Sequence, residues 1–384
     1  MGLHQFGSGE VVIDSLHHGV PDKVRFDLIM TRRGPRNDIT DVAGIAVGHF
    51  HRIEDGWLTG TTVVLPPKGT VAGVDVRGGG PGTRETDCLE PTTMVSTIDA
   101  ICLSGGSAYG LDAASGVVSW LAEHQRGFQV GPEPHHIVPI VPAAVLFDLG
   151  AGGNFMNHPD GSFGYEAARR ATMSELAQGT VGAGAGARAG GLKGGIGSAS
   201  TILPNGITIG VLIAVNSSGS PVSPATGELW GAGYGIADEF AHLCQPNATE
   251  LKTWLDMPRV PRPLNTTLAI IATDAKMAKH ECTRLASVGH DGMARAINPI
   301  HQYTDGDLVF ALATGEKDFP EDDLEQPKGA LQSVNSRVLK LNEIFNAAAD
   351  CVARAIVHAM LNATSVGTTQ SYRDRFPSAF VFPK

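Results

Sequence analysis

Cysteine is scarce in this sequence of 384 residues, and its spacing argues against two common roles. The number of cysteines is odd, and no two of them are separated by only two residues. A disulfide framework calls for an even number, and a zinc knuckle for closely spaced pairs. We therefore expect reduced thiols and a cytoplasmic protein. The cysteines are Cys88, Cys102, Cys244, Cys282 and Cys351.

Positive charge and long apolar runs are lacking too. Lys and Arg number 29 against 39 Asp and Glu, which gives a formal net charge of −10. Because no basic cluster offsets this charge, we expect no nucleic-acid and no membrane partner. The longest apolar run, around Ile207 to Val215, is too short to span a bilayer. The segment from Met1 to Arg32 lacks the continuous apolar core of a signal peptide.

Metal and nucleotide motifs are missing as well. The sequence contains neither H-E-x-x-H nor a Cys/His set with zinc-site spacing, so we expect no metal. It has no G-x-x-x-x-G-K-[ST] phosphate loop. A G-x-G-x-x-A match at Gly184, Gly186 and Ala189 has no strong strand before it and no helix-forming run after it. We therefore predict that the protein uses no cofactor.

Glycine, in contrast, is abundant, with 48 residues, and 42% of the chain is hydrophobic. This composition indicates a globular interior with many tight turns or close backbone approaches. The length alone suggests two or three domains, although a layered α/β fold can hold this many residues in one core. We predict an N-terminal extension over residues 1–36 and a single α/β domain over residues 37–384.

Apolar patterning predicts strands and helices along most of that domain. Two prolines in the apolar run from Ile137 to Asp148 indicate an edge or bulged strand. The run from Ile207 to Val215 is expected to be a central strand. Other strands are expected at 45–49, 61–65, 101–104, 268–273 and 308–312, and helices at 107–123, 165–176, 233–244, 276–297 and 339–361.

The stretch from Leu264 to Asp274 is where we expect the chemistry to be centred. A polar Asn265-Thr266 pair stands between a Pro-rich connector and an apolar, β-branched run. A Thr hydroxyl is a weak nucleophile unless a base activates it, and its own freed α-amino group can be that base. We therefore predict cleavage of the Asn265–Thr266 bond, which makes Thr266 an N-terminal nucleophile. Alternatively, the Asn-Thr-Thr tripeptide merely starts a strand.

Four further polar residues occupy positions that suit this chemistry. Lys193 is surrounded by glycines and could lie near developing negative charge. Asn216 ends the run at Val215, where its side-chain amide could donate to an oxyanion, although it could equally be a turn residue. Asp305 and Asp307 share one tight turn, and without further context a solvated Asp-Gly turn is the simpler interpretation.

A charged Gly-rich loop follows the strand expected at Val74. From Arg77 to Asp87 it contains four glycines and could approach a ligand closely, which makes Arg77 a candidate substrate-binding residue. The alternative is a solvated turn that carries an Arg77–Glu85 or Arg84–Asp87 surface pair.

Taken together, several of these stretches resemble one family of peptidases. It includes L-aminopeptidase D-Ala-esterase/amidase, the β-peptidyl aminopeptidases and the nylon-oligomer hydrolase. The resemblance implies a four-layer αββα sandwich, similar to the N-terminal-nucleophile hydrolases but connected differently, and a homo-oligomer, namely a tetramer. The matching stretches are 77–87, 103–112, 142–148, 193–200, 214–219, 265–274 and 290–314.

Carried over by position, the resemblance assigns roles to the residues above. It implies self-cleavage into an α chain of residues 1–265 and a β chain of residues 266–384, with Thr266 as nucleophile. It places Asn216 and Lys193 beside Thr266. It also implies that Asp305 and Asp307 hold the Thr266 ammonium or hydroxyl. The expected activity is hydrolysis of amide bonds in small peptides or amino-acid amides.

Two departures concern the substrate side of the site. Phe147 stands where the nylon-oligomer hydrolase carries a Tyr, and Asp148 lies in a segment that lacks the Glu that aminopeptidase members use near the substrate amine. Aminopeptidase specificity is therefore less firmly implied than amide hydrolysis. Two other hypotheses remain open: an acyltransferase like ornithine acetyltransferase, which also uses a Thr freed by self-cleavage, and an unprocessed ligand-binding module.

Overall fold

The computed structural model describes residues 31–257, 264–319 and 336–381. Most of the expected N-terminal extension, residues 1–30, lies outside the described residues, and so does the whole Pro-rich connector, residues 258–263. Near the start of the described part, Arg32 forms an antiparallel β-bridge with Ile202. The Asp38 side chain then accepts a hydrogen bond from the Thr40 N–H and caps the 3₁₀ helix η1 (Ile39–Asp41).

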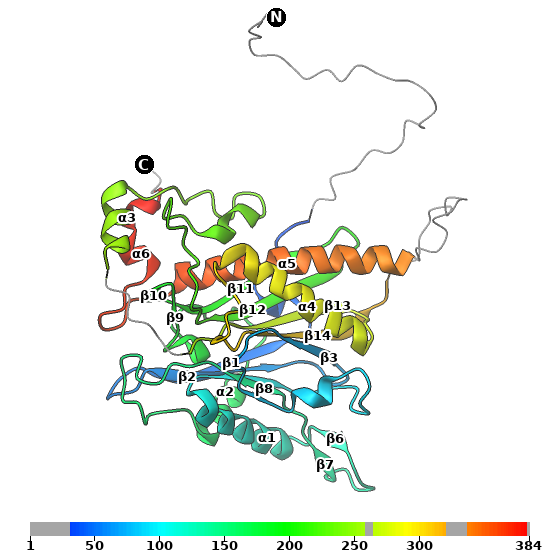
Figure 1. Cartoon of the computed structure of the whole chain (residues 1–384). Coiled ribbons are helices and arrows are strands. Elements are labelled where there is room, and N and C mark those ends of the chain that lie inside the picture. Colours follow the sequence, from blue (N-terminus) through cyan, green and yellow to red (C-terminus); the bar gives the residue numbers. More distant parts are fainter. Residues whose placement is uncertain (1–30, 258–263, 320–335, 382–384) are drawn as a thin grey trace, which may run out of the picture. The chain divides into compact units, whose positions relative to one another are not determined.

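Two five-stranded sheets form the body of this part of the chain (Figure 1). The first has the order β1-β2-β5-β8-β4, with β1 (Ala46–Arg52), β2 (Thr59–Leu65), β5 (Ile101–Ser104), β8 (Ala143–Val145) and β4 (Thr83–Arg84). The second has the order β11-β12-β13-β14-β3, with β11 (Gly195–Ile202), β12 (Thr208–Val215), β13 (Leu268–Ala275), β14 (Leu308–Lys317) and β3 (Val71–Val76).

Alternating side chains show how the layers pack. On β2, Val63 packs toward helices α1 (Ala113–Glu123) and α2 (Gly161–Arg169), whereas its neighbour Val64 packs between the two sheets. On β12, Leu212 packs between the sheets, whereas Val211 packs toward helices α4 (Lys279–Ala296) and α5 (Ser336–Asn362). Both faces of each sheet are thus buried. This arrangement confirms the predicted four-layer αββα sandwich.

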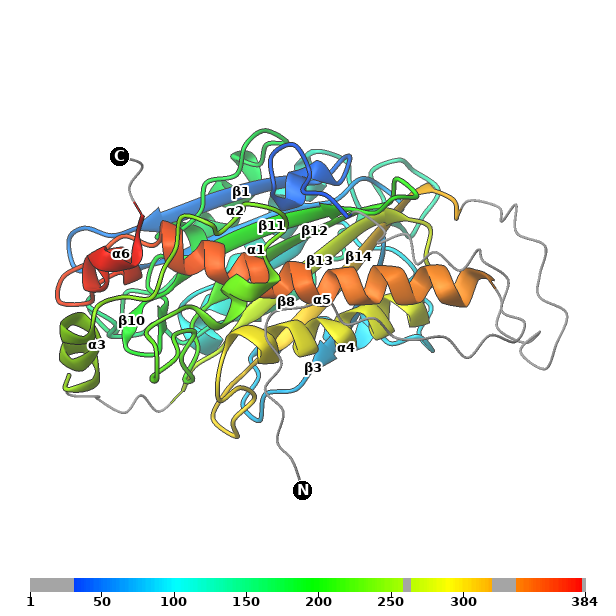
Figure 2. The ribbon, with the colours of Figure 1, turned by 90° about the horizontal axis from the view of Figure 1, so that it is seen from above.

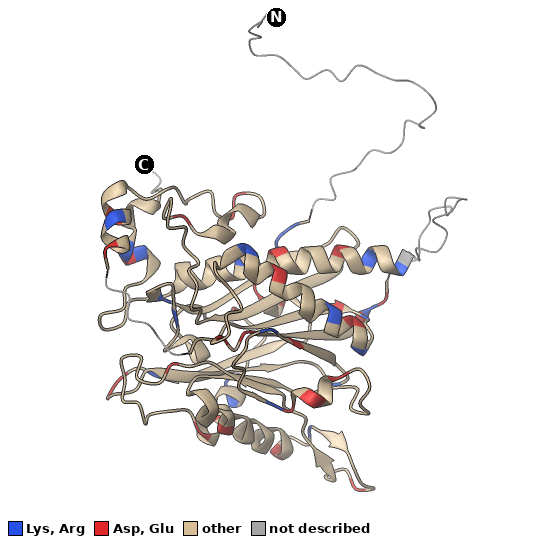
Figure 3. Cartoon of the chain, viewed as in Figure 1, with Lys and Arg blue, Asp and Glu red and all other residues tan. Residues whose placement is uncertain are grey.

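Helix α5 is the longest described helix, and together with α4 it runs across the second sheet (Figure 2). Its stretch Arg337–Asn362 is long and apolar enough to cross a membrane by length and composition alone. However, 78% of its most apolar window is buried within the fold, as expected of a core helix. Acidic and basic residues are mixed along both helices (Figure 3).

The remaining described elements are short. They are the strands β6 (Phe128–Gln129), β7 (Ile137–Val138), β9 (Arg188–Ala189) and β10 (Leu192–Lys193), the helices α3 (Ala248–Leu255) and α6 (Tyr372–Arg375), and the 3₁₀ helices η2 (Thr86–Leu89), η3 (Ser107–Asp112), η4 (Gly182–Gly184), η5 (Trp230–Tyr234) and η6 (Pro377–Ala379).

Three of the predicted elements were wrong in whole or in part. The helix expected at 165–176 begins and ends earlier, as α2 over Gly161–Arg169. The strand expected to be an edge or bulged strand, β8, lies inside the first sheet, parallel to β5 and antiparallel to β4, and its register with both is regular. It tolerates this place because Pro142 precedes its first paired residue and leaves the ladder intact. The helix expected at 233–244 is absent, and η5 with turns takes its place. Gly233 and Gly235 there lower the helix propensity.

Candidate active site

The Asn265–Thr266 bond lies just before β13, and both residues are buried. The Thr266 hydroxyl Oγ1 donates to the Asn265 carbonyl oxygen at 2.6 Å. The Gly306 N–H donates to the same carbonyl oxygen at 2.9 Å. The Thr266 N–H donates to the Asn216 carbonyl oxygen at 2.8 Å, which fixes the other side of the bond. The Asn265 carbonyl oxygen thus accepts hydrogen bonds from both the candidate nucleophile and a backbone N–H.

The lack of a side chain at Gly306 leaves room for the Thr266 hydroxyl. A Cβ atom placed on Gly306 would lie 2.6 Å from Thr266 Oγ1 and 2.9 Å from the Gly80 carbonyl oxygen. Any side chain at position 306 would therefore push against the hydroxyl or against backbone. The φ angle of Gly306 is not in the left-handed region, so its backbone conformation does not require glycine. Glycine is required because the Thr266 hydroxyl and the Gly80 backbone approach this position closely.

Asp307 is fully buried and holds the backbone on the carboxyl side of Thr266. Its Oδ1 accepts the Thr267 N–H at 2.7 Å. Its Oδ2 accepts two hydrogen bonds from His301, one from the backbone N–H at 3.2 Å and one from Nδ1 at 3.0 Å. The Asp307 carbonyl oxygen accepts the N–H groups of Arg77 and Gly78. A carboxylate with this many donors is rigidly placed.

Asp305 lies beside Asp307 but is less well satisfied. Its Oδ2 accepts the Gln302 N–H at 2.9 Å, whereas Oδ1 is buried with no hydrogen-bond partner among the described residues. Burial and the neighbouring Asp307 charge raise the pKa of Asp305 to about 6. Because both aspartates are buried, they do not form a solvated Asp-Gly turn. A carboxyl group that titrates near neutrality is typical of functional sites.

Asn216 links three segments around the Asn265–Thr266 bond. Besides the backbone bond to Thr266, its Oδ1 accepts the Arg188 N–H at 3.0 Å and its Nδ2 donates to the Phe147 carbonyl oxygen at 3.1 Å. The side chain is fully buried. Its amide N–H, which the sequence suggests as an oxyanion donor, is directed at the Phe147 carbonyl oxygen. The Asn265 carbonyl oxygen accepts from the Gly306 N–H and the Thr266 hydroxyl.

Lys193 is buried within the glycine-rich segment. Its Nζ donates at 2.9 Å to each of three carbonyl oxygens, those of Gly184, Ala187 and Gly194. Burial nevertheless lowers the pKa of Lys193 to about 7, aided by the nearby Arg188 charge. Lys193 is paired with Arg188 across β9 and β10, and the Arg188 N–H binds Asn216. Lys193 therefore supports the Asn216 side of the site.

The three residues expected at the substrate have different surroundings. Asp148 is buried; its Oδ1 accepts the Gly106 N–H at 2.7 Å, and burial raises its pKa to about 6. Phe147 is partly buried and presents its carbonyl oxygen to Asn216. The Arg77 guanidinium is directed away from this cluster, because it donates to Asp75 and to Ser287 on α4. Only the Arg77 backbone reaches Asp307.

The sequence did not single out His301, His290 or Gly306 as site residues. His301 has a positive φ of 58° and packs its ring edge-on against His290, with centroids 4.6 Å apart. Neither residue lies in a motif with metal or triad spacing, so no local signal identified them. The Gly between two aspartates was visible, but its role depends on contact with Thr266.

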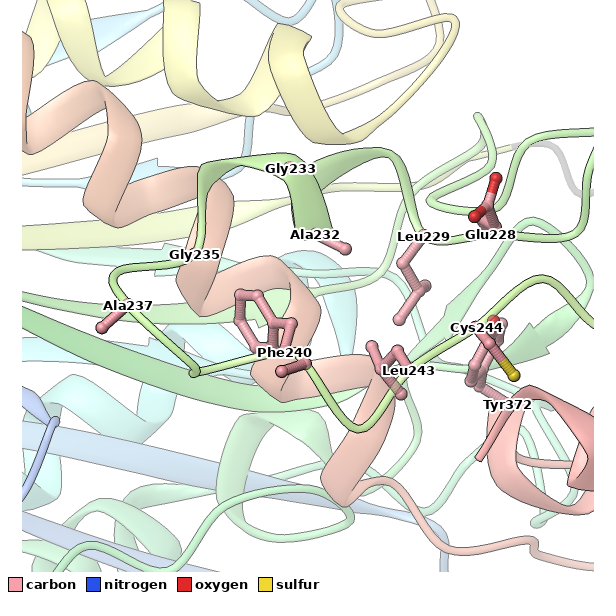
Figure 4. A pocket seen from close by; sticks show the side chains of 11 residues that line it. Glu228, Leu229, Ala232, Gly233, Gly235, Ala237, Phe240, Leu243, Cys244 and Tyr372 are labelled. Atoms are coloured by element: carbon pink, nitrogen blue, oxygen red, sulfur yellow. The ribbon is translucent and has the colours of Figure 1, made fainter. Parts of the chain in front are cut away.

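A cavity of about 330 Å³ lies elsewhere in the fold, between η5, the turns that follow it and α6 (Figure 4). Its lining includes Leu229, Phe240 and Leu243, together with Tyr372 from α6. It includes none of the candidate site residues. In the described ranges, no group of three or more His, Cys, Asp or Glu residues is arranged to hold a metal ion.

This chain is similar to several known proteins. Residues 37–373 match the model of peptidase family S58. An uncharacterized aminopeptidase of Mycobacterium tuberculosis is 47% identical over 354 residues, which are 90% of this chain and 99% of the relative. The 6-aminohexanoate-oligomer endohydrolase of Kocuria sp. is 32% identical over 315 residues, covering 79% of this chain and 82% of that enzyme. The solved structure of L-aminopeptidase D-Ala-esterase/amidase from Ochrobactrum anthropi, a new variant among the Ntn hydrolase fold, has a TM-score of 0.63 at 22% identity and covers 90% and 91% of the two chains.

Proposed function

Because this chain belongs to peptidase family S58, we propose that it is a self-processing hydrolase whose Thr266, freed by cleavage of the Asn265–Thr266 bond, attacks the amide bonds of small peptides or amino-acid amides. Membership of this family shows that the chain is a hydrolase of peptide or amide bonds, as the resemblance implies. An unprocessed ligand-binding module is thereby disfavoured. Self-processing and the choice of substrate are the parts we propose.

The observation that carries the proposal is the Thr266 hydroxyl at 2.6 Å from the Asn265 carbonyl oxygen. In the first reaction, Oγ1 attacks the Asn265 carbonyl carbon, a C–O bond forms and the C–N bond breaks. The hydroxyl proton passes to the leaving nitrogen, which becomes the Thr266 amine. Water then hydrolyses the ester and releases the Asn265 carboxylic acid. The Gly306 N–H is placed to stabilise the negative oxygen of the intermediate.

In later turnovers the same hydroxyl would attack a substrate carbonyl. The new α-amino group, with an ordinary pKa of about 7.7–8.0, can accept the hydroxyl proton and return it to the leaving amine. Asp307 would keep the start of the β chain in place through the Thr267 N–H. Asp305, whose Oδ1 has no partner in the described part of the uncut chain, is suited to bind the new ammonium group.

The substrate proposal draws on the relatives and on the residues at the acyl side. One relative is named as an aminopeptidase and another as an oligomer endohydrolase for 6-aminohexanoate. Phe147 has no hydroxyl for a substrate, and Asp148 is buried. We therefore propose small amides without assigning a stereochemical preference. A screen of amino-acid p-nitroanilides, D-amino-acid amides and ω-amino-acid oligomers would rank these classes.

We also propose that the enzyme is cytoplasmic and assembles from several copies, a tetramer by family resemblance. All five cysteines are free thiols, which suits a reducing compartment. Exposed apolar side chains, such as Met94 and Met156, offer surface that an assembly could bury. Sedimentation of the purified protein would measure the number of subunits.

Mass spectrometry and N-terminal sequencing of the purified protein test the central proposal. We expect two chains, residues 1–265 and 266–384, with the smaller one beginning Thr-Thr-Leu. Thr266→Ala should remain one inactive chain, whereas Thr267→Ala should still be cut at the same bond. An active, unbroken wild-type chain would refute self-processing. Transfer of the acyl group to an added amine such as ornithine, in preference to water, would favour the acyltransferase.

A further inference from the structure

His301 connects to the cleavage bond through a single carboxylate. Its backbone N–H and its Nδ1 both donate to Asp307 Oδ2, at 3.2 and 3.0 Å. The other oxygen of the same carboxylate accepts the Thr267 N–H at 2.7 Å. His301 is therefore one hydrogen-bonded group away from the residue that follows Thr266. No other described side chain donates to Asp307.

The backbone of His301 adopts an unusual conformation that makes this double contact possible. Its φ angle of 58° lies in the left-handed region, which residues with a Cβ rarely adopt. In that conformation the N–H and the ring of one residue reach the same oxygen. A glycine would satisfy the backbone at this position but would lose the ring donor, so the histidine is needed for its side chain.

The hydrogen-bond partners define which ring nitrogens carry protons. A carboxylate only accepts, so His301 Nδ1 carries the hydrogen in its bond to Asp307. His290 Nε2 donates to the Asp75 carbonyl oxygen at 3.0 Å, and burial lowers the pKa of His290 to about 4. A neutral His290 ring thus packs edge-on against His301 and restricts its rotation.

We propose that His301 is a positioning residue that fixes the Asp307 carboxylate, and through the Thr267 N–H keeps Thr266 Oγ1 against the Asn265 carbonyl. This inference rests on the proposed function, because it concerns the same cleavage reaction. His301 touches no reacting atom. Its contribution is to prevent the Asp307 side chain from rotating, and displacements of the order of 1 Å at a reacting group can reduce a rate about 100-fold.

Three substitutions separate the hydrogen bond from the shape of the backbone. His301→Gly relaxes the left-handed backbone and removes the ring donor, whereas His301→Ala keeps the strain and removes the donor. His301→Asn is the matched control, because asparagine tolerates positive φ and its Nδ2 can replace Nδ1 as a donor. Each variant is made by cell-free synthesis as the full chain, and the fraction cut at Asn265–Thr266 is followed by mass spectrometry over time.

We expect His301→Gly and His301→Ala to mature roughly 10- to 100-fold more slowly than wild type, and His301→Asn to remain within about 3-fold of wild type. Thermal unfolding on the Thr266→Ala background identifies any variant that does not fold. If the glycine variant does not fold, the alanine and asparagine variants still give the comparison. Wild-type maturation in the glycine or alanine variant, or equal slowing in all three, would overturn the role of the ring donor. Those outcomes would leave the proposed function intact, because wild type would still be cut and Thr266→Ala would not.

Discussion

The backbone N–H of Gly306 lies 2.9 Å from the carbonyl oxygen of Asn265, although the two residues belong to distant parts of the chain. They meet because β13 and β14 are parallel neighbours, with Leu268 opposite Leu308 in the register. The residues that lead into the two strands therefore also run side by side, and Asn265 forms a parallel bridge with Asp305. The backbone donor on the Asn265 carbonyl is thus positioned by the strand pairing.

Gly306→Ala should slow self-cleavage. The added Cβ would lie 2.6 Å from Thr266 Oγ1, so the hydroxyl must move away from the Asn265 carbonyl. We expect cleavage to slow by roughly 10- to 100-fold, with a loss of about 1–3 kcal/mol in the free energy of unfolding from the same crowding. Quantitative mass spectrometry of freshly synthesised protein measures the cleavage rate.

The matched control is Gly233→Ala, where an added Cβ would have no neighbour within 4 Å. This variant should be cut at the wild-type rate. If Gly306→Ala were cut as fast as Gly233→Ala, the hydroxyl could not depend on the space at position 306. The Thr266 assignment itself would then rest on Thr266→Ala alone.

The secondary structure of this chain was largely predictable because its strands carry long apolar runs. The predicted strands at 207–215 and 268–273 correspond to β12 and β13, which are buried on both faces, and the predicted helices at 276–297 and 339–361 correspond to α4 and α5. The segment 233–244, wrongly predicted to be a helix, contains two glycines and packs against α5, through Phe240 and His358, and beside α6. Local apolar spacing cannot report such packing.

The candidate site was predictable only in part, for a related reason. Asn265 and Thr266 stand out because a polar pair interrupts the entry to an apolar strand. The contributions proposed for Gly306 and His301 depend on the parallel pairing of β13 with β14 and on a left-handed φ angle. Neither feature leaves a period or spacing in the sequence. The end of the apolar run at Val215, in contrast, is visible in the sequence, and it suggests Asn216 as an oxyanion donor.

Asp305→Asn should lower activity but raise stability. Catalysis that needs the Asp305 carboxylate should fall as the pH drops through about 6, because burial and Asp307 raise the pKa of Asp305 to about 6. A raised carboxyl pKa means that the folded chain binds more protons than the unfolded chain between pH 3.8 and about 6. The ionised group therefore destabilises the fold at neutral pH.

We expect Asp305→Asn to lower turnover and to remove this acidic limb from the pH profile. On the uncut Thr266→Ala background it should raise the free energy of unfolding by roughly 2–3 kcal/mol more at pH 7 than at pH 3.5. Urea unfolding at the two pH values measures the difference. Asp318→Asn, at a side chain that is 81% exposed, serves as control and should change neither quantity. An unchanged acidic limb in Asp305→Asn would assign that limb to another group.

Glu239→Gln should destabilise the fold through a buried ion pair that is not part of the candidate site. The Arg354 guanidinium is fully buried and donates to both oxygens of Glu239, at 2.6 and 3.0 Å. It also donates to Asn37 Oδ1, where the predicted domain begins. Loss of the Glu239 charge leaves Arg354 buried without its counter-ion, so we expect the free energy of unfolding to fall by about 3–5 kcal/mol at pH 7.

The pH dependence of that loss provides the decisive measurement. Although burial acts to raise it, hydrogen bonds from His358 and Arg354 hold the pKa of Glu239 well below its ordinary value of 4.5. A depressed carboxyl pKa stabilises the fold above pH 4.5, and this stabilisation is lost as the pH falls below that value. The difference between wild type and Glu239→Gln, each on the Thr266→Ala background, should therefore be smaller at pH 3 than at pH 7. Glu316→Gln, an exposed control, should show no difference from wild type at either pH.

A double variant tests the ion pair directly. Glu239→Gln combined with Arg354→Met should recover part of the lost free energy of unfolding, because it removes the unpaired buried charge. A further loss in the double variant would show that Arg354 stabilises the fold mainly through its other hydrogen-bond partners, Ser200, Thr201 and Asn37.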